Sequence, residues 1–364
     1  MLTVGIVGLP NAGKSTLFNA LVSARQAPVA SYPFCTIEPN VAVVELPDPR
    51  LDALAPVFGA ATRVPAAIEF FDIAGLVSGA SRGEGLGNRF LGHIREVDAI
   101  VQVVRGFERG DVAHVDGSVD PIRDIDTIET ELILADLETV ARRHEKIERQ
   151  RRAGDKSVDA ELELLGRLQA GLDEGFPARR VHRDPHAQAG ARHLFLLTDK
   201  TTLYAVNVAE ADLTGAPPAV ERVRQRGASD GAHVVSLCAE LEAELADLEP
   251  DEASEYLDSL GMQERGSDAL IRAAFEALGL VTFFTGNEKE VRARPVRAGI
   301  TAHQAAADVH ADIQRGFIGA EVLPAEVLIE EGSLHAARDH GRMRLEGRDY
   351  RVQDGDVIQF RFNV

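Results

Sequence analysis

The sequence predicts an α/β protein with a doubly wound, mostly parallel sheet, an inserted α-helical hairpin and a C-terminal α+β domain. Short apolar runs alternate with helical segments along the first 124 residues and again after residue 195. This is the pattern of a parallel sheet with crossover helices. Between these parts, apolar residues recur at helical spacing on both sides of a polar, glycine-containing stretch, as in an antiparallel hairpin. From about residue 280, strand-like runs surround a single helix.

Six apolar runs are the candidate strands of the main sheet. They are residues 2–8, 40–46, 67–71, 99–104, 202–208 and 233–237. The hairpin is predicted from the apolar residues Ile125, Ile128 and Leu132 in one helix and Leu165 and Leu168 in the next. These spacings place each set on one face of its helix.

The composition is that of an ordinary globular protein, with 45% hydrophobic and 27% charged residues. No apolar run approaches the ~18 residues of a membrane span, and the N-terminus lacks the features of a signal peptide. Cys35 and Cys238 are the two cysteines, too few for a disulfide framework or a zinc site, so we expect a cytoplasmic protein. The net charge of −19 argues against DNA binding, although a local basic patch is compatible with RNA.

A glycine-rich segment follows the first apolar run directly. Gly8, Gly13, Lys14 and Ser15 match the pattern G-x-x-x-x-G-K-S between a predicted strand and a predicted helix, the context of a phosphate-binding P-loop. Backbone N–H groups there face phosphate oxygens, and the helix N-terminus adds positive potential. Lys14 is the predicted catalytic cation at the β- and γ-phosphates. The predicted phosphate-binding residues are Asn11, Ala12, Gly13, Lys14, Ser15 and Thr16. The fold is therefore predicted to be a P-loop NTPase.

Oxygen-bearing side chains in three segments predict a Mg²⁺ site. Ser15 supplies a hydroxyl from the P-loop, and Asp72 ends a predicted strand as the first residue of a D-x-x-G motif. The glycine of this motif, Gly75, offers its amide to the γ-phosphate. Thr36 lies in the intervening loop, where a threonine would complete the metal shell. An ordinary loop threonine is the alternative for Thr36.

The segment Asn207–Glu210 ends the fifth strand, at the position where translation-factor GTPases carry Asn-Lys-x-Asp. Here Val208 follows Asn207 and Glu210 replaces the aspartate, so the short carboxylate that reads the N1–H and amino group of guanine is missing. A guanine base whose N1–H and amino group find no acceptor loses about 1–3 kcal/mol of binding free energy, which favours ATP over GTP. Ser236 matches the last base-contacting loop in position. A GTPase with relaxed base specificity is the alternative.

Leu76 directly follows the D-x-x-G motif, where Ras-like enzymes orient the attacking water with a glutamine. A leucine side chain forms no hydrogen bonds, so hydrolysis must be slow or assisted by another side chain, a cation or a partner. A nucleotide-gated binding module with incidental hydrolysis is therefore a second alternative.

The predicted hairpin has a basic tip. Five arginines gather there: Arg142, Arg143, Arg149, Arg151 and Arg152. One interpretation is an arm that contacts RNA through this tip. The other is a solvated helix surface with no partner.

Several of these motifs together resemble the YchF/Obg-like ATPase family. They are Gly8–Thr16, Phe34–Asn40, Asp72–Val77, Gly83–Asn88 and Asn207–Glu210, and the resemblance extends over essentially the whole chain. It implies an ATPase that associates with ribosomes, a coiled-coil arm and a C-terminal module similar to a TGS domain. Asn11 resembles a residue that helps hold K⁺ in related hydrolases, and His114 resembles the family's candidate catalytic histidine. A surface histidine is the alternative for His114.

The expected domains follow from these patterns. Residues 1–124 and 196–280 form the nucleotide-binding domain, residues 125–195 the helical arm and residues 281–364 the TGS-like module. The expected ligands are ATP and Mg²⁺, with K⁺ as a further candidate, and the expected partner is the ribosome with its RNA.

Overall fold

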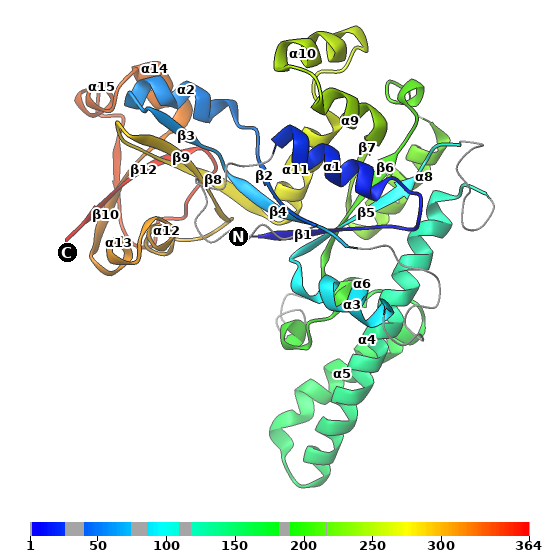
Figure 1. Ribbon diagram of the computed structural model, residues 1–364. Coiled ribbons are helices and arrows are strands. Elements are labelled where there is room, and N and C mark those ends of the chain that lie inside the picture. The colour runs from blue at the N-terminus through cyan, green and yellow to red at the C-terminus, as the bar shows by residue number, and fades with distance from the viewer. Residues whose placement is uncertain are drawn as a thin grey trace.

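The computed structural model describes residues 2–25, 40–73, 86–108, 118–181, 190–215 and 217–363. Two six-stranded sheets organise this part of the chain, and a long helical hairpin projects from the first of them (Figure 1).

The first sheet has the strand order β2-β4-β1-β5-β6-β7. Its strands are β1 (Thr3–Val7), β2 (Val41–Glu45), β4 (Ala67–Asp72), β5 (Ala99–Arg105), β6 (Thr201–Asn207) and β7 (His233–Leu237). All neighbouring strands are parallel except β2, which runs antiparallel to β4. The predicted mostly parallel sheet is confirmed. The carboxyl ends of its five parallel strands consequently lie along one edge, where ligands bind in open α/β sheets.

Helices cover both faces of this sheet. On one face, α1 (Lys14–Arg25) and α11 (Gly266–Ala277) share an apolar core with β5, which includes Leu17, Leu270 and Val101. The other face is covered by α3 (Leu86–Glu96), α8 (Pro218–Asp230) and the first turns of α4 (Pro121–Arg152). Also in this part of the fold are α9 (Ala239–Ala246), α10 (Pro250–Ser259) and the short helix η6 (Glu210–Asp212). This two-sided cover is the doubly wound arrangement.

The hairpin consists of α4 (Pro121–Arg152) and α5 (Asp159–Asp173), joined by η3 (Lys156–Val158). The side chain of Asp120 accepts hydrogen bonds from the first backbone N–H groups of α4, and Pro121 occupies the first helical position. With 32 residues, α4 extends roughly 48 Å. Val140, Leu165 and neighbouring apolar residues form a separate core between the two helices. The chain returns to the sheet through α6 (Ala178–Val181), η4 (Arg192–Leu194) and η5 (Leu197–Asp199).

The second sheet has the order β11-β10-β12-β8-β9-β3. Its strands are β3 (Thr62–Val64), β8 (Leu280–Gly286), β9 (Glu290–Arg297), β10 (Phe317–Pro324), β11 (Arg344–Glu346) and β12 (Asp356–Phe362). Its helices are α12 (Ala302–Val309), α13 (Ala311–Arg315), α14 (Ala325–Glu331) and α15 (Leu334–Asp339). The C-terminal module is predicted from the sequence to be α+β, and the strands and helices observed after residue 280 agree with this prediction.

One strand of the second sheet comes from far upstream in the chain. Strand β3 pairs in parallel with β9, and the preceding helix α2 (Pro49–Phe58) packs against α14 and β9. Phe58 of α2 and Phe284 of β8 belong to the same apolar cluster as Leu17 of α1. The two sheets therefore share one continuous core, an arrangement that sequence pattern alone did not predict.

Candidate nucleotide-binding site

The P-loop connects β1 to α1 at the ligand-binding edge of the first sheet. Gly13 has a φ angle of +94°, and a Cβ atom at this position would lie 2.2 Å from Nδ2 of Asn207. Only glycine fits this backbone without a collision. Asn11 is exposed with a φ of 64°, a conformation that asparagine tolerates. Because α1 begins at Lys14, its unbonded N–H groups face the loop and provide an anion-binding surface.

Lys14 lies inside this loop rather than in solvent. Its side chain is 8% exposed, and Nζ donates a hydrogen bond to the carbonyl oxygen of Leu9 at 2.8 Å. Burial lowers the pKa of Lys14, and the Asp72 carboxylate partly opposes this shift. The ammonium group is thus held at the centre of the loop, where it can meet the β- and γ-phosphates of a nucleotide.

Ser15 and Asp72 form a hydroxyl–carboxylate pair at the P-loop. Oγ of Ser15 donates to Oδ2 of Asp72 at 3.1 Å. Asp72 ends β4, in register with Ile6 of β1, so two adjacent strands bring the pair together. Hydroxyl and carboxylate oxygens suit Mg²⁺, which otherwise keeps water and phosphate ligands. No cluster of three or more His, Cys, Asp or Glu side chains that could hold a metal ion occurs in the described parts of the chain.

Asn207 joins two loops of the site. Its side chain is buried; Nδ2 donates to the carbonyl oxygen of Ala12 at 3.0 Å, and Oδ1 accepts from the backbone N–H of Ala239 at 2.9 Å. The P-loop is thereby fixed to the loop after β7. Val208 is 1% exposed and packs in the apolar cluster with Tyr204. It follows that Val208 can contact a bound nucleotide only through its backbone.

The other residues predicted to contact the base, Glu210 and Ser236, lie close to this pair of loops. Glu210 is exposed at the start of η6, and its carboxylate raises the pKa of Tyr256 on α10. Ser236 belongs to β7, partly exposed, one residue before the Leu237 that pairs with Asn207. Both residues are therefore near the carboxyl ends of β6 and β7, as their spacing predicts.

Sequence reasoning missed Arg105, the last residue of β5, and Phe107, two residues later, at the same edge of the sheet. Arg105 is 2% exposed and pairs in register with Asn207. Its Nε donates to the carbonyl oxygen of Phe107 at 3.2 Å, and its guanidinium carbon lies 4.6 Å from the centre of the Phe107 ring. The signal in the sequence was a cation directly after the predicted strand 99–104, at the place where a parallel strand meets the site.

Thr36, Gly75, Leu76 and His114 lie outside the described residues. The structure thus brings together the P-loop, Ser15 with Asp72, and Asn207 with its neighbours. Within the described residues, no helix is long and apolar enough to cross a membrane.

Two family models match the chain. A model described as a 50S ribosome-binding GTPase covers residues 3–150, and the YchF-GTPase C-terminal model, described as a protein of unknown function, covers residues 280–363.

Relatives match along the full length. The "Ribosome-binding ATPase YchF" of Bacillus subtilis is 49% identical, with all of both chains aligned. The protein of the same name from Escherichia coli O157:H7 is 46% identical over 99% of each chain. "Obg-like ATPase 1" of Pongo abelii is 42% identical over the whole chain and 93% of that protein.

Solved structures agree with these matches. The Schizosaccharomyces pombe YchF GTPase superposes with a TM-score of 0.88 at 34% identity and covers 99% of this chain and 97% of its own. A GTP-binding protein of Pyrococcus horikoshii has a TM-score of 0.60 at 19% identity over the full length of both chains, which supports the fold alone. The motif resemblance is confirmed: this chain belongs to the YchF family.

Proposed function

We propose that this chain is a Mg²⁺-dependent ATPase that hydrolyses ATP to ADP and phosphate. The observation that carries the proposal is the convergence of Lys14, Ser15 and Asp72 at the carboxyl edge of one parallel sheet. A buried cation, a hydroxyl and a carboxylate beside a helix N-terminus are the groups that phosphoryl transfer requires. Full-length relatives named as ATPases support it further.

The proposed roles follow from these positions. Backbone N–H groups of residues 11–16 hold the phosphates, and Lys14 stabilises negative charge on the β- and γ-phosphates. Ser15 and Asp72 would hold Mg²⁺ together with Thr36, and the metal would neutralise charge that develops on the phosphates. We propose Gly75 as a γ-phosphate amide donor and His114 as the candidate group that assists attack by water. Leu76 forms no hydrogen bonds, so we expect slow intrinsic turnover.

We assign the base preference to ATP because Glu210 replaces the short carboxylate that guanine requires. A GTPase remains the second candidate, since one matched family model and one structural relative carry that description. Competition binding of ATP and GTP to nucleotide-free protein separates the two. Tighter GTP binding would reject the ATPase assignment.

A monovalent cation is a further part of the proposal. Asn11 is exposed on the P-loop with its backbone turned to positive φ, so its side chain is accessible beside the phosphates. If Asn11 helps to hold K⁺, turnover should be faster in K⁺ than in Na⁺ at equal ionic strength. Equal rates in both salts would exclude this role.

We propose the ribosome as the partner and hence the cytoplasm as the place of action. Relatives are named ribosome-binding, and the hairpin tip, residues 142–156, carries seven cationic and three acidic side chains on a chain with net charge −19. Arg149 and Arg152 pair with Glu145 and Glu148 at 2.5 and 2.6 Å. These arginines are more than 70% exposed, and such surface pairs are weak, so RNA phosphates can replace the carboxylates.

The alternative of a nucleotide-gated ribosome-binding module makes a different prediction. In that case, a form locked with a non-hydrolysable ATP analogue would bind ribosomes and retain full biological activity. A turnover enzyme would be inactive when locked. Ribosome co-sedimentation with ATP, ADP and the analogue, together with complementation by a hydrolysis-deficient variant, distinguishes them.

A further inference from the structure

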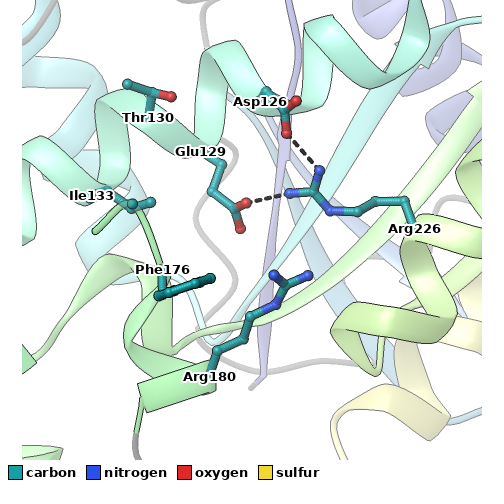
Figure 2. Close-up of a pocket in the computed structure, with 8 residues that line it drawn as sticks. Asp126, Glu129, Thr130, Ile133, Phe176, Arg180 and Arg226 are labelled. Atoms are coloured by element: carbon teal, nitrogen blue, oxygen red, sulfur yellow. Dashed lines mark hydrogen bonds and ion pairs between the residues drawn. The ribbon is translucent and has the colours of Figure 1, made fainter. Parts of the chain in front are cut away.

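A cavity of about 340 Å³ lies where the root of the helical hairpin meets α8, away from the P-loop edge (Figure 2). Its wall is formed by α4, the loop between α5 and α6, α6 itself and α8. Pockets that bind small molecules usually measure about 300–1,000 Å³, so this cavity has room for a small ligand. The residues that give it chemical character are Asp126, Glu129, Ile133, Phe176, Arg180 and Arg226.

The two arginines of the cavity are not equally satisfied. Arg226 uses all three nitrogens, bonding Asp126 at 2.6 Å, Glu129 at 2.5 Å and Asp230 at 2.7 Å. Arg180 bonds Asp230 and Ser229 through Nη2 alone, and its Nε is buried with no acceptor among the described residues. A buried donor without a partner costs free energy and calls for an explanation. Nε of Arg180 thus has no acceptor, although Nη2 of the same guanidinium has two. Because Nε is buried, a ligand in the cavity reaches only the exposed part of this side chain, which is 26% exposed.

The acidic groups stand on the opposite side. Figure 2 shows Asp126 and Glu129 across the opening from Arg180 and Phe176. The side chain of Asp126 is 54% exposed, whereas that of Glu129 is 13% exposed. Two carboxylates and two guanidinium groups line the cavity, the Asp230 carboxylate bonds both arginines, and the Arg179 guanidinium bonds Glu129. Three charges of each sign therefore balance. A polyanion such as a nucleotide would meet the carboxylates and be repelled, whereas a ligand with one charge of each sign matches both sides.

An apolar surface lies beside these charges. Phe176 follows Gly175 in the turn between α5 and α6 and is 46% exposed, and Ile133 of α4 is 6% exposed. A half-exposed phenylalanine next to a cavity offers a face on which an apolar or aromatic side chain can pack. The cavity therefore combines a guanidinium donor, an accessible carboxylate and an aromatic ring within one small volume.

We propose that this cavity binds a free α-amino acid with an apolar or aromatic side chain. Its carboxylate accepts hydrogen bonds from Arg180, its ammonium group faces Asp126, and its side chain packs on Phe176. The nucleotide site gives no reason to expect a ligand of this class. The proposal also stands if the nucleotide preferences above are wrong, because it uses none of the P-loop residues.

Titration of the full-length protein with L-phenylalanine and L-leucine, followed by calorimetry and ligand-observed NMR, tests the proposal. Both should bind, and N-acetyl-L-phenylalanine amide, which lacks both charges, should bind at least about tenfold more weakly, the loss expected for one charge-assisted hydrogen bond. L-Aspartate should also bind weakly because its second carboxylate faces Asp126 and Glu129.

Three variants sharpen the test. Arg180→Gln and Asp126→Asn should each weaken phenylalanine binding about tenfold. Phe176→Ala, at a half-exposed position where folding is preserved, should weaken phenylalanine more than glycine. The matched control is Arg224→Gln, an exposed arginine on the same helix as Arg226 but outside the cavity, which should bind like wild type. Absence of amino-acid binding overturns the proposal, as does equal binding of the uncharged analogue or unchanged binding in folded Phe176→Ala.

Discussion

The side-chain amide of Asn207 donates a hydrogen bond to the backbone carbonyl of Ala12 in the P-loop, 195 residues earlier in the chain, at 3.0 Å. The same side chain accepts from the N–H of Ala239. Asn207 was predicted to contact the nucleotide base. In the structure, its side chain joins the P-loop to the loop after β7. These loops are predicted to meet the phosphates and the base, so nucleotide affinity should depend on this brace.

Replacing Asn207 with alanine should weaken ATP and GTP binding to a similar degree. The substitution leaves two buried backbone groups without partners, at about 1–3 kcal/mol each, so the free energy of unfolding should fall as well. Urea unfolding and nucleotide titration measure both effects. Asn19→Ala, an exposed asparagine on α1, is the control. If only one nucleotide loses affinity, Asn207 reads the base and does not brace the loops.

The stability of the nucleotide-free protein should depend on pH through Lys14. Burial lowers the pKa of Lys14 below the ordinary 10.5, so between that lowered pKa and 10.5 the unfolded chain binds more protons than the folded one. Stability should therefore rise with pH in this window. Lys14→Met removes the titrating amine and should flatten this part of the curve. Because all other groups are shared, the difference between the two urea-unfolding series isolates Lys14.

The same variant tests the phosphate contact. Lys14→Met should lose tight ATP binding and turnover, because the β- and γ-phosphates lose their point charge. In the wild type, ATP affinity should decline as the pH rises through the lowered pKa of Lys14, since only the ammonium form attracts phosphate. If Lys14→Met hydrolyses ATP as fast as the wild type, Lys14 does not act on the phosphates and the P-loop is not the ATPase site.

Glu210→Asp should shift the preference toward GTP, because it restores the short carboxylate that reads guanine. Adding Val208→Lys, which would complete Asn-Lys-x-Asp, is unsuitable: Val208 is 1% exposed in an apolar cluster, and a buried ammonium would destabilise the fold. Competition binding gives the ATP/GTP ratio, with the exposed Glu221→Asp on α8 as control. An unchanged ratio would mean that backbone groups set base choice.

Charge reversal of Arg149, Arg151 and Arg152 to glutamate should weaken ribosome binding and flatten its salt dependence, because fewer phosphate counterions are released. The matched control is a variant that removes negative charge from the tip instead of positive charge. Glu145→Gln with Glu148→Gln frees Arg149 and Arg152 from their intrahelical pairs and should strengthen binding. ATP hydrolysis without ribosomes should be unaffected in both. Co-sedimentation with ribosomes at two salt concentrations measures both effects. If the charge-reversed variant binds like wild type with the same salt dependence, the tip is a solvated surface.

The sequence predicted those parts of the site that one short segment encodes. The P-loop and Asp72 lie next to apolar strands, so local pattern and strand order together placed them at one sheet edge. The brace from Asn207 to Ala12 depends on a contact between distant segments, which no local spacing reveals. The contact of Arg105 with Phe107 is local, but it depends on how the chain bends after β5, which the residue pattern does not state. The inward orientation of Val208 was missed for the same reason, because a motif position does not state which way a side chain faces.

Strand β3 and its partner β9 are separated by more than 220 residues of chain, and this has a consequence for biosynthesis. At roughly 5–20 residues per second, a ribosome needs on the order of 10–50 s after β3 emerges before β9 is available. During this interval, Phe58 of α2 has no second-sheet core to enter. The nascent N-terminal half therefore needs protection by a chaperone or by transient burial. A chain truncated at residue 280 stays in that condition permanently, so loss of function in such a deletion reports misfolding, and point variants are the sound way to probe the C-terminal module.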